Sequence, residues 1–244
     1  MWQLEDRVVV VTGAAGDIGR ATVRLLAEAG AKLVLADLDG PGAIRLAASV
    51  HGDRAVGVAY DATDPAAGAA LVATAVERFG AIDVLVPAAG IYPTAPLAEI
   101  DDVAWRHCLA VNLDGAFQLC RAAAPVLRAP ASIVLIASIA AHHGSPDHAH
   151  YAAAKGGLAA LGRSLAKELA PDVRVNTISP GPIEGTMVRP LMAARGDRVL
   201  AATPLGRLGR PEEVANCIAF LASPLSSFVT GATLHVNGGL YLSS

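Results

Sequence analysis

Tyr151 and Lys155 are the residues best suited to chemistry, because they stand in the segment Tyr151-Ala-Ala-Ala-Lys155. On a helix this spacing places both side chains on one face, one turn apart. An ammonium group beside a phenol stabilises the phenolate and lowers the pKa of the tyrosine, so the pair predicts proton exchange near neutral pH. Chance often produces this spacing, so the prediction depends on further polar residues at the same place.

Two further polar residues strengthen the prediction. Ser138 comes just after the apolar run 133–136, so it is expected at the carboxyl edge of a sheet, where ligands bind in folds of this class. Asn112 stands in Val111-Asn112-Leu113, within a long helical segment at 101–127, where a polar side chain needs a reason. The candidate catalytic residues are therefore Asn112, Ser138, Tyr151 and Lys155.

A glycine-rich turn, Thr12-Gly13-Ala14-Ala15-Gly16-Asp17-Ile18-Gly19, joins the first apolar run to the first helical segment. Such a turn brings backbone N–H groups and the positive end of a helix against a diphosphate. Asp37 ends the second apolar run, where a carboxylate can accept hydrogen bonds from the adenosine ribose and repel a 2′-phosphate. Its neighbours Leu38 and Asp39 supply no cation, so NAD is favoured over NADP. Asp61 is placed to meet the adenine edge, although capping of its own turn explains it nearly as well.

Apolar runs and alanine-rich helical segments alternate along the whole chain. The apolar runs lie at 8–11, 32–36, 55–59, 84–86, 132–136, 173–178 and 233–236. The helical segments lie at about 18–29, 41–50, 66–79, 101–127, 150–170 and 211–222. Most runs are continuously apolar, which is typical of parallel strands covered on both faces. The pattern predicts an α/β fold with a doubly wound parallel sheet of seven strands, helices on both faces and a single domain spanning 1–244.

Composition narrows the class of protein. The chain has 244 residues, 53% of them hydrophobic, and a formal net charge of −3 without a basic stripe, so no nucleic-acid partner is expected. No apolar run approaches the roughly 20 residues of a membrane span, and the first residues lack a signal-peptide pattern. Three cysteines without metal-ligand spacing suit a reduced thiol state, so we expect a cytoplasmic protein without a membrane partner.

These motifs together resemble the short-chain dehydrogenase/reductase family, and the likeness covers essentially the whole chain. It is carried by the glycine turn, the four candidate catalytic residues, and Pro180-Gly181 after the sixth apolar run. The C-terminal segments 204–208 and 228–239 look like those of the 3-oxoacyl-(acyl-carrier-protein) reductase group. The resemblance implies a Rossmann fold and hydride transfer to or from a nicotinamide cofactor, which carries that chemistry itself.

The resemblance also implies a role for each residue. Tyr151 would be the general acid/base, Lys155 would lower its pKa and hold the nicotinamide ribose, and Ser138 would bind the reacting oxygen. Asn112 would position a water in a proton relay ending at Lys155. The implied cofactor-binding residues are Gly13, Asp17, Ile18, Gly19, Asp37, Asp61, Ala62, Ala89, Gly90, Tyr151, Lys155, Pro180, Gly181 and Ile183.

Three departures from the family pattern bear on this site. Asp17 replaces the middle glycine of the turn, and because a carboxylate repels a diphosphate, its side chain is expected to turn away. The Asn-Asn-Ala-Gly segment of the family reads Pro87-Ala-Ala-Gly90, which puts hydrogen bonding at the sheet edge in doubt. The threonine expected five residues after Pro180 is Gly185, with Thr186 displaced by one position.

The substrate pocket is expected between the segment 139–150 and a lid at about 183–200. Its predicted lining residues are Tyr92, Ile139, His142, His148 and Met187. The histidines near 142–150 have no carboxylate or cysteine that completes a ligand set, so no metal site is expected.

The preferred prediction is an NAD-dependent oxidoreductase that interconverts a secondary alcohol and a ketone, both small molecules. Because NAD in cells is largely oxidised, a preference for NAD favours the direction of alcohol oxidation. A 3-oxoacyl thioester reductase remains the alternative because of the C-terminal resemblance. Two minor alternatives are an extended sugar-nucleotide epimerase or dehydratase and, from another class, a non-catalytic dinucleotide sensor. The small residues of the helix at 150–170, together with the resemblance, suggest a homotetramer.

Overall fold

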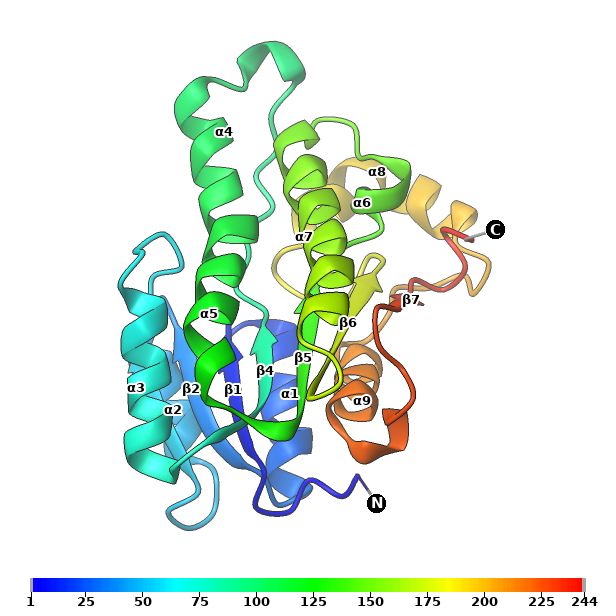
Figure 1. Cartoon of the computed structure of the whole chain (residues 1–244). Helices are drawn as coiled ribbons and strands as arrows, with labels where there is room; N and C mark the ends of the chain where they lie inside the picture. The colour runs from blue at the N-terminus through cyan, green and yellow to red at the C-terminus, as the bar shows by residue number, and fades with distance from the viewer. Residues whose placement is uncertain (1, 243–244) are drawn as a thin grey trace.

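The computed structural model describes residues 2–242, in which seven parallel strands form one sheet in the order β3-β2-β1-β4-β5-β6-β7 (Figure 1). The strands are β1 (Val8–Thr12), β2 (Lys32–Asp37), β3 (Ala55–Ala59), β4 (Ile82–Pro87), β5 (Leu127–Ile136), β6 (Val173–Pro180) and β7 (Thr233–Val236). Every strand pair is parallel. The predicted doubly wound seven-stranded sheet is therefore confirmed.

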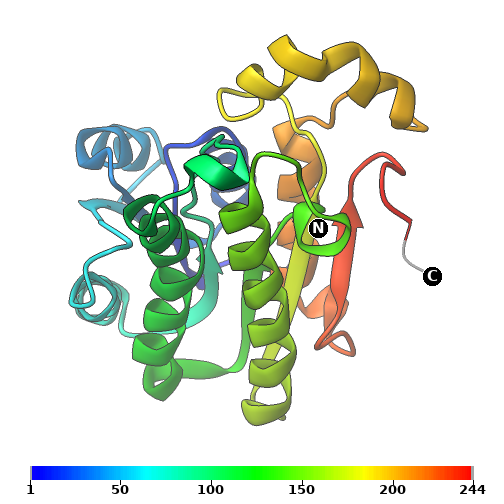
Figure 2. The same cartoon turned by 90° about the horizontal axis from the view of Figure 1, so that it is seen from above.

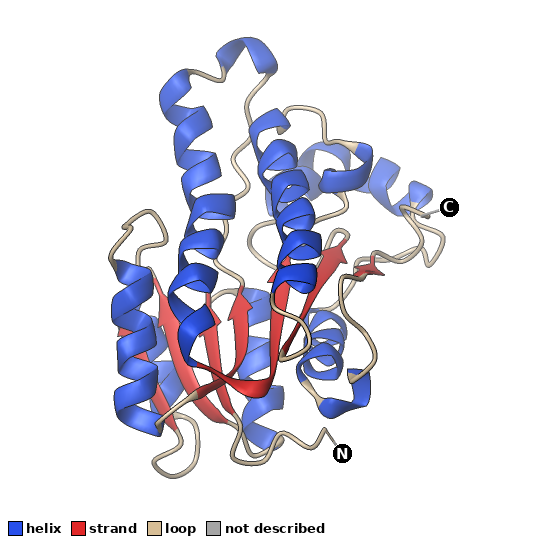
Figure 3. Ribbon diagram, viewed as in Figure 1, coloured by secondary structure: helices blue, strands red, loops and turns tan. Residues whose placement is uncertain are grey.

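Helices cover both faces of the sheet (Figure 3). The first face carries α1 (Asp17–Glu28), α2 (Gly40–Ala48) and α9 (Pro211–Ala222), and the second carries α3 (Ala67–Phe79), α5 (Gly115–Ala123) and α7 (Ala149–Glu168). Side chains of alternate positions along the strands enter opposite cores, so Val9 and Val11 pack toward α1 and α9 while Val10 packs toward α3 and α5. Burial on both sides explains why these strands read as continuous apolar runs.

Three further helices stand above the carboxyl edge of the strands, namely α4 (Asp102–Leu109), α6 (Ala140–His143) and α8 (Arg189–Ala202). Short 3₁₀ helices lie at Leu97–Glu99, Ala124–Val126 and Pro224–Ser226. Seen from above, α8 lies toward the side of the sheet away from α7 (Figure 2). The strand order reverses direction between β1 and β4, and this is where ligands bind in doubly wound sheets.

The structure differs from the predicted elements in two places that matter for the site. The segment expected as one long helix at 101–127 is divided by a π-helical turn, Ala110–Asp114, between α4 and α5. The predicted lid contains a helix, α8, which the sequence pattern did not indicate because none of its residues is buried. Among residues 2–242, no helix has the length and apolar character needed to cross a membrane.

Candidate active site

The first turns of α7 hold Tyr151 and Lys155 in the protein interior, with only 8% and 5% of each residue exposed. The Lys155 ammonium Nζ donates a 2.9 Å hydrogen bond to the carbonyl oxygen of Ile136, the last residue of β5. That nitrogen lies 5.8 Å from the centre of the Tyr151 ring. Helix spacing thus brings the two residues to the carboxyl edge of the sheet, as the sequence predicts.

Burial dominates the ionisation of both residues. It raises the pKa of Tyr151 to about 12, and the neighbouring Ser138 hydroxyl opposes this shift only in part. It also lowers the pKa of Lys155 to about 8. The sequence predicts the opposite direction for Tyr151, because spacing reveals the ammonium but not the loss of water around the phenol. In the protein without cofactor, Tyr151 is a protonated phenol that can donate a proton.

Ser138 follows β5 and is half-buried beside Tyr151. Its Oγ accepts a 3.2 Å hydrogen bond from the backbone N–H of Ala140. The backbone N–H of Ile139 donates to the carbonyl of Pro180, which joins the ends of β5 and β6. Ser138 is therefore held by a local turn at the sheet edge, and its own proton remains available for a substrate oxygen.

Asn112 lies in the π-helical turn and is 1% exposed. Its Nδ2 donates to the carbonyls of Ile91 and Cys108, each at 3.0 Å, and its Oδ1 accepts from the backbone N–H of Ile91 at 3.2 Å. A side chain on Gly90 would meet Asn112 Oδ1 at 2.8 Å. The amide therefore clamps the loop after β4 against the helix, and the π turn directs it there.

The glycine turn packs closely against the end of β4. Gly13 has a φ of +65°, and a Cβ there would meet the Ala88 carbonyl oxygen at 2.7 Å. The Thr12 hydroxyl oxygen accepts hydrogen bonds from the backbone N–H groups of Ala88 and Ala89, at 3.1 and 3.2 Å. This bonding holds the segment after Pro87 without the family's asparagine side chains. The bare backbone at Gly13 and Gly19 fits a dinucleotide diphosphate at the start of α1.

Asp37 ends β2 and its carboxylate is held by two backbone amides. The N–H of Ala15 donates to Oδ2 and the N–H of Asp39 donates to Oδ1, both at 2.9 Å. The residue stays half-exposed, so its remaining lone pairs can accept ribose hydroxyl groups. The sequence reasoning missed Arg20, whose Nε donates to the carbonyl of Ala15 at 2.6 Å and places a cation near the same loop. Its position directly after Gly19, at the end of the glycine turn, is the sequence feature that indicates this cation.

Asp17 begins α1 and directs its carboxylate to Thr186, in the predicted lid. Its Oδ2 accepts a 2.7 Å hydrogen bond from the backbone N–H of Thr186 and a 3.0 Å hydrogen bond from the Thr186 hydroxyl. Ile18 packs against the core between the sheet and α1. The contact between residues 17 and 186 is the second feature that the sequence reasoning did not find.

The remaining predicted cofactor residues lie along the same edge. The Oδ1 atom of Asp61 accepts hydrogen bonds from the Thr63 N–H and hydroxyl, which lower the pKa of the Asp61 carboxyl, so it does cap its own turn. Ala62 is buried against Gly115. Ile183 is buried and pairs with Gly209 in an isolated bridge, and Gly181 approaches the Asn237 backbone too closely for a side chain.

Tyr92 and His148 form one wall beside Tyr151. Their rings stack with centres 3.9 Å apart, and Tyr92 meets the ring of Tyr151 edge-on at 4.7 Å. His148 Nδ1 lies 2.7 Å from the carbonyl of Pro146 and must donate to it, while Nε2 accepts from the Thr94 hydroxyl at 3.0 Å. Burial lowers the pKa of His148, so this wall is a neutral, polar surface.

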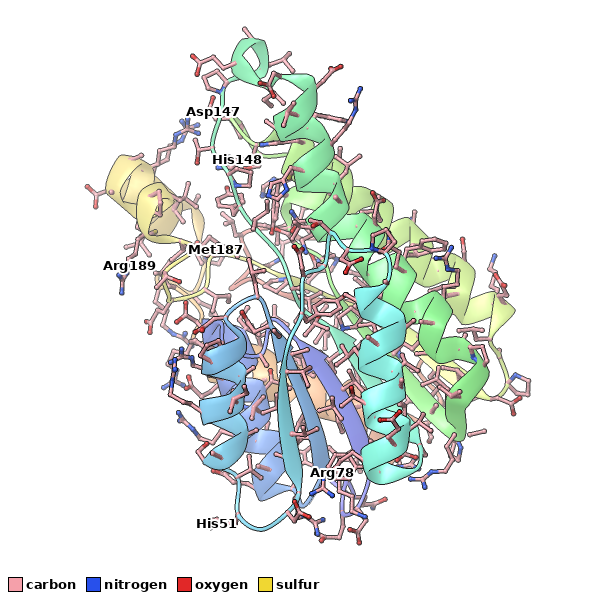
Figure 4. The ribbon with its side chains drawn as sticks, turned by 90° about the vertical axis from the view of Figure 1, so that its left-hand side faces the viewer. His51, Arg78, Asp147, His148, Met187 and Arg189 are labelled. Carbon is pink, nitrogen blue, oxygen red and sulfur yellow. The ribbon has the colours of Figure 1, made fainter. Side chains whose placement is uncertain are left out.

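The structure does not group the other predicted lining residues with that wall. Ile139 is buried directly before α6, and Met187, which is half-exposed, lies near the start of the predicted lid. His142 packs instead with His235 and Tyr241 from the last part of the chain. Figure 4 shows Asp147 and His148 on the loop beside α8, at the end of the molecule opposite His51 and Arg78.

Two further observations concern possible binding sites outside the candidate active site. A cavity of about 580 Å³ lies between the segment 204–213, which supplies Leu205 and Arg207, and β7 with the loop after it, which supply His235 and Tyr241; none of the candidate catalytic residues lines it. Within residues 2–242, no group of three or more His, Cys, Asp or Glu side chains is arranged to bind a metal ion.

Known proteins resemble this chain along nearly its full length. A family model described as enoyl-(acyl carrier protein) reductase matches residues 13–241. A cis-4-hydroxycyclohexanecarboxylate dehydrogenase from Sinomonas cyclohexanicum is 45% identical over 239 residues, which is 96% of each chain. A 3-oxoacyl-(acyl-carrier-protein) reductase from Vibrio cholerae is 38% identical and covers 98% of this chain and 99% of its own.

A crystal structure of a short-chain dehydrogenase/reductase from Brucella melitensis, described as a glucose/ribitol dehydrogenase, superposes with a TM-score of 0.96. It is 48% identical, and the match covers 99% of each chain. Proteins of the short-chain dehydrogenase/reductase family use a nicotinamide dinucleotide cofactor, which the glycine turn and Asp37 fit. They are oxidoreductases that act on alcohol or keto groups. The chain therefore belongs to the short-chain dehydrogenase/reductase family, near its 3-oxoacyl reductase-like members.

Proposed function

We propose that this protein is an NAD-dependent oxidoreductase that interconverts a secondary alcohol and a ketone, with Tyr151 as the general acid/base. The observation that carries the proposal is the buried phenol of Tyr151, which lies beside Ser138 and one helical turn from Lys155, at the sheet edge that also bears the glycine turn. This arrangement supplies a proton donor, a hydroxyl for the reacting oxygen and a cation that can return the proton.

When bound, the dinucleotide supplies or accepts the hydride at the carbon that bears the oxygen. During reduction, Ser138 donates a hydrogen bond to the ketone oxygen and Tyr151 gives that oxygen its phenolic proton. Hydride plus proton convert the ketone to the alcohol, and Lys155 stabilises the phenolate that remains. Oxidation runs through the same groups in reverse, with the Tyr151 phenolate taking the proton of the alcohol. Asn112 keeps the loop at Ile91 in place beside these groups.

The choice of NAD rests on Asp37. Its carboxylate is fixed by the N–H groups of Ala15 and Asp39 at the end of β2, where it suits ribose hydroxyl groups and repels a 2′-phosphate. Replacing it with alanine removes both effects. We expect Asp37→Ala to weaken NADH binding and to shift the NADH-to-NADPH preference by about tenfold to a hundredfold toward NADPH.

Arg20 sharpens that test, because its cation lies at the same loop. In the Asp37→Ala background, Arg20→Ala should reduce NADPH binding again by removing a partner for the 2′-phosphate. Dissociation constants from fluorescence titration of both cofactors give the readout. If Asp37→Ala leaves the preference unchanged, another group sets the cofactor choice.

For the substrate, the relative named for cis-4-hydroxycyclohexanecarboxylate supports a small secondary alcohol, since its hydroxyl lies on a ring CH–OH carbon. The neutral wall of Tyr92 and His148 suits a compact polar substrate of this kind. The second candidate is a 3-oxoacyl thioester, which the Vibrio cholerae relative and the C-terminal segment favour. NADH oxidation with 4-oxocyclohexanecarboxylate beside acetoacetyl thioester separates them: turnover of the thioester alone would reject the first candidate.

We further propose that the protein acts as a homotetramer in the cytoplasm. Light scattering of the purified chain tests the assembly, and a monomeric mass would reject it.

A further inference from the structure

The carboxylate of Asp17 joins two parts of the molecule that are far apart in the chain. Asp17 is the first residue of α1, and Thr186 lies at the start of the predicted lid, 169 positions later. Both hydrogen bonds from Thr186 end on one oxygen atom, Oδ2. The glycine turn and the lid are therefore connected by a single carboxylate oxygen.

The backbone beside Thr186 is shaped for this contact. Gly185 has a φ of +150°, a conformation that favours glycine. A Cβ at Gly185 would collide with the carboxylate of Asp17, and it would lie 3.0 Å from the Asp17 Cβ. The absence of a side chain at position 185 thus lets the carboxylate reach both donors of Thr186.

Apart from the buried side chains of Ile183 and Val188, the described part of the lid has few other anchors. Its root is fixed where the N–H of Glu184 donates to Gly209 and Ile183 bridges to the same residue. None of the residues of α8 is buried, and Arg195 forms an ion pair with Asp147 that is exposed to solvent. An exposed pair of this kind contributes little. Between root and helix, the bonds to Asp17 are the connection between the lid and the glycine turn.

The charge of Asp17 explains why this connection matters for the cofactor. A carboxylate at a helix N-terminus is stabilised by the helix dipole, and the same end of the helix attracts a diphosphate. Two anions at one helix end repel each other unless one is directed elsewhere. The donors of Thr186 give the Asp17 carboxylate such a direction, toward the lid.

We propose that Asp17 is a positioning residue that fastens the lid to the phosphate-binding turn, so that the lid stays closed over the dinucleotide. The inference rests on the dinucleotide site of the proposed function, but not on the choice between NAD and NADP. It predicts that losing the contact opens the lid and weakens cofactor binding.

A pair of substitutions separates the contact from the charge. Asp17→Asn keeps an oxygen acceptor for Thr186 and removes the negative charge, whereas Asp17→Ala removes both. In amide hydrogen exchange of the protein without cofactor, we expect Asp17→Ala to accelerate exchange across residues 183–202 by about tenfold and Asp17→Asn by less than about twofold. Asp197→Ala, an exposed carboxylate of the same lid, is the matched control and should exchange like the parent protein.

Cofactor binding provides the second readout. Asp17→Ala should raise the NADH dissociation constant by about fivefold relative to Asp17→Asn, because only the alanine variant loses the fastening. Equal lid exchange in the alanine and asparagine variants would overturn the proposal. Should Asp17→Ala fail to fold, Thr186→Val removes the hydroxyl bond without altering the glycine turn. That variant should accelerate lid exchange by about threefold, and no acceleration would overturn the proposal.

These results can be told apart from failure of the proposed function. A parent protein that binds NADPH but not NADH would contradict the cofactor choice, while lid exchange without cofactor would still report on Asp17.

Discussion

The helices α7 and α8 border the same site, but they are held in opposite ways. Along α7, buried positions recur from His150 to Ala166, and Tyr151 and Lys155 are among them. In α8 none of the residues is buried, and its helical geometry breaks at Arg195. Its described links to the rest of the protein include the ion pair to Asp147 and, just before it, the bonds of Thr186 to Asp17.

This difference in packing suggests that α7 holds the reacting groups and that α8 controls how ligands enter and leave the site. A proton donor must keep a fixed place, and packing against the sheet provides that for α7. The predicted lid that contains α8 would have to open and close, and polar contacts that water can replace at small cost suit such a role. We infer that substitutions on α7 change the chemical step, whereas substitutions on α8 change binding and release.

The largest effect is expected from Tyr151→Phe, which removes the phenolic proton and leaves the ring in place. General acid/base catalysis contributes about 10²-fold to 10⁴-fold, so turnover should fall by that factor. The NADH dissociation constant should stay within about threefold of the parent value. Tyr241→Phe is the matched control, because that tyrosine packs with His142 away from Tyr92 and His148. Unchanged turnover in Tyr151→Phe would remove the residue from the proposed role.

A stability comparison tests the difference in packing directly. Leu158 on α7 is 1% exposed, so Leu158→Ala should lower the free energy of unfolding by about 2–5 kcal/mol. Leu191 on α8 is only half-buried, and Leu191→Ala should cost less than about 1 kcal/mol. Urea denaturation followed by circular dichroism measures both. Equal losses would show that α8 packs as firmly as α7.

The pH dependence of the two reaction directions follows from burial on α7. The pKa of Tyr151 is raised to about 12, so the phenolate that oxidation needs becomes more abundant throughout the neutral and alkaline range. Alcohol oxidation should therefore increase by up to about tenfold per unit up to about pH 8, and level off above it as Lys155, whose pKa is about 8, loses the proton that stabilises the phenolate. Ketone reduction uses the protonated phenol and should decline only as Lys155, with a pKa of about 8, loses its proton. An oxidation rate that is level across the neutral range would contradict the raised pKa of Tyr151.

The smallest effect is expected from the exposed ion pair of α8. Asp147→Asn should change the free energy of unfolding by less than about 0.5 kcal/mol, because exposed pairs are screened by solvent. Its effect on hydrogen exchange in the lid should be smaller than that of Asp17→Ala. A larger effect would make Asp147, rather than Asp17, the principal anchor of the lid.

Much of the fold can be predicted from local sequence patterns. Runs such as Val8–Val11 mark strands, and the spacing of Tyr151 and Lys155 places them on one helical face. The π turn around Asn112 could not be predicted, because the apolar period does not report one extra residue in a helical turn. For α8 the reason is the lack of a buried face, which leaves no periodic signal.

The candidate site also has features that the sequence predicts and features that it does not. Asp37 and the glycine turn are identified by their places at the ends of strands, and the structure puts them at one edge. The contact of Asp17 with Thr186 depends on how the lid returns across the sheet, which sequence spacing does not encode. The raised pKa of Tyr151 likewise depends on burial by neighbours from distant segments.

The most direct test is the rate of a single turnover of enzyme-bound NADH with 4-oxocyclohexanecarboxylate, measured by stopped flow for the parent protein, Tyr151→Phe and Asp147→Asn. We expect a loss of at least about 100-fold in Tyr151→Phe and a change of less than about threefold in Asp147→Asn. Comparable losses in both variants, or a full rate in Tyr151→Phe, would contradict the assignment of the chemistry to α7.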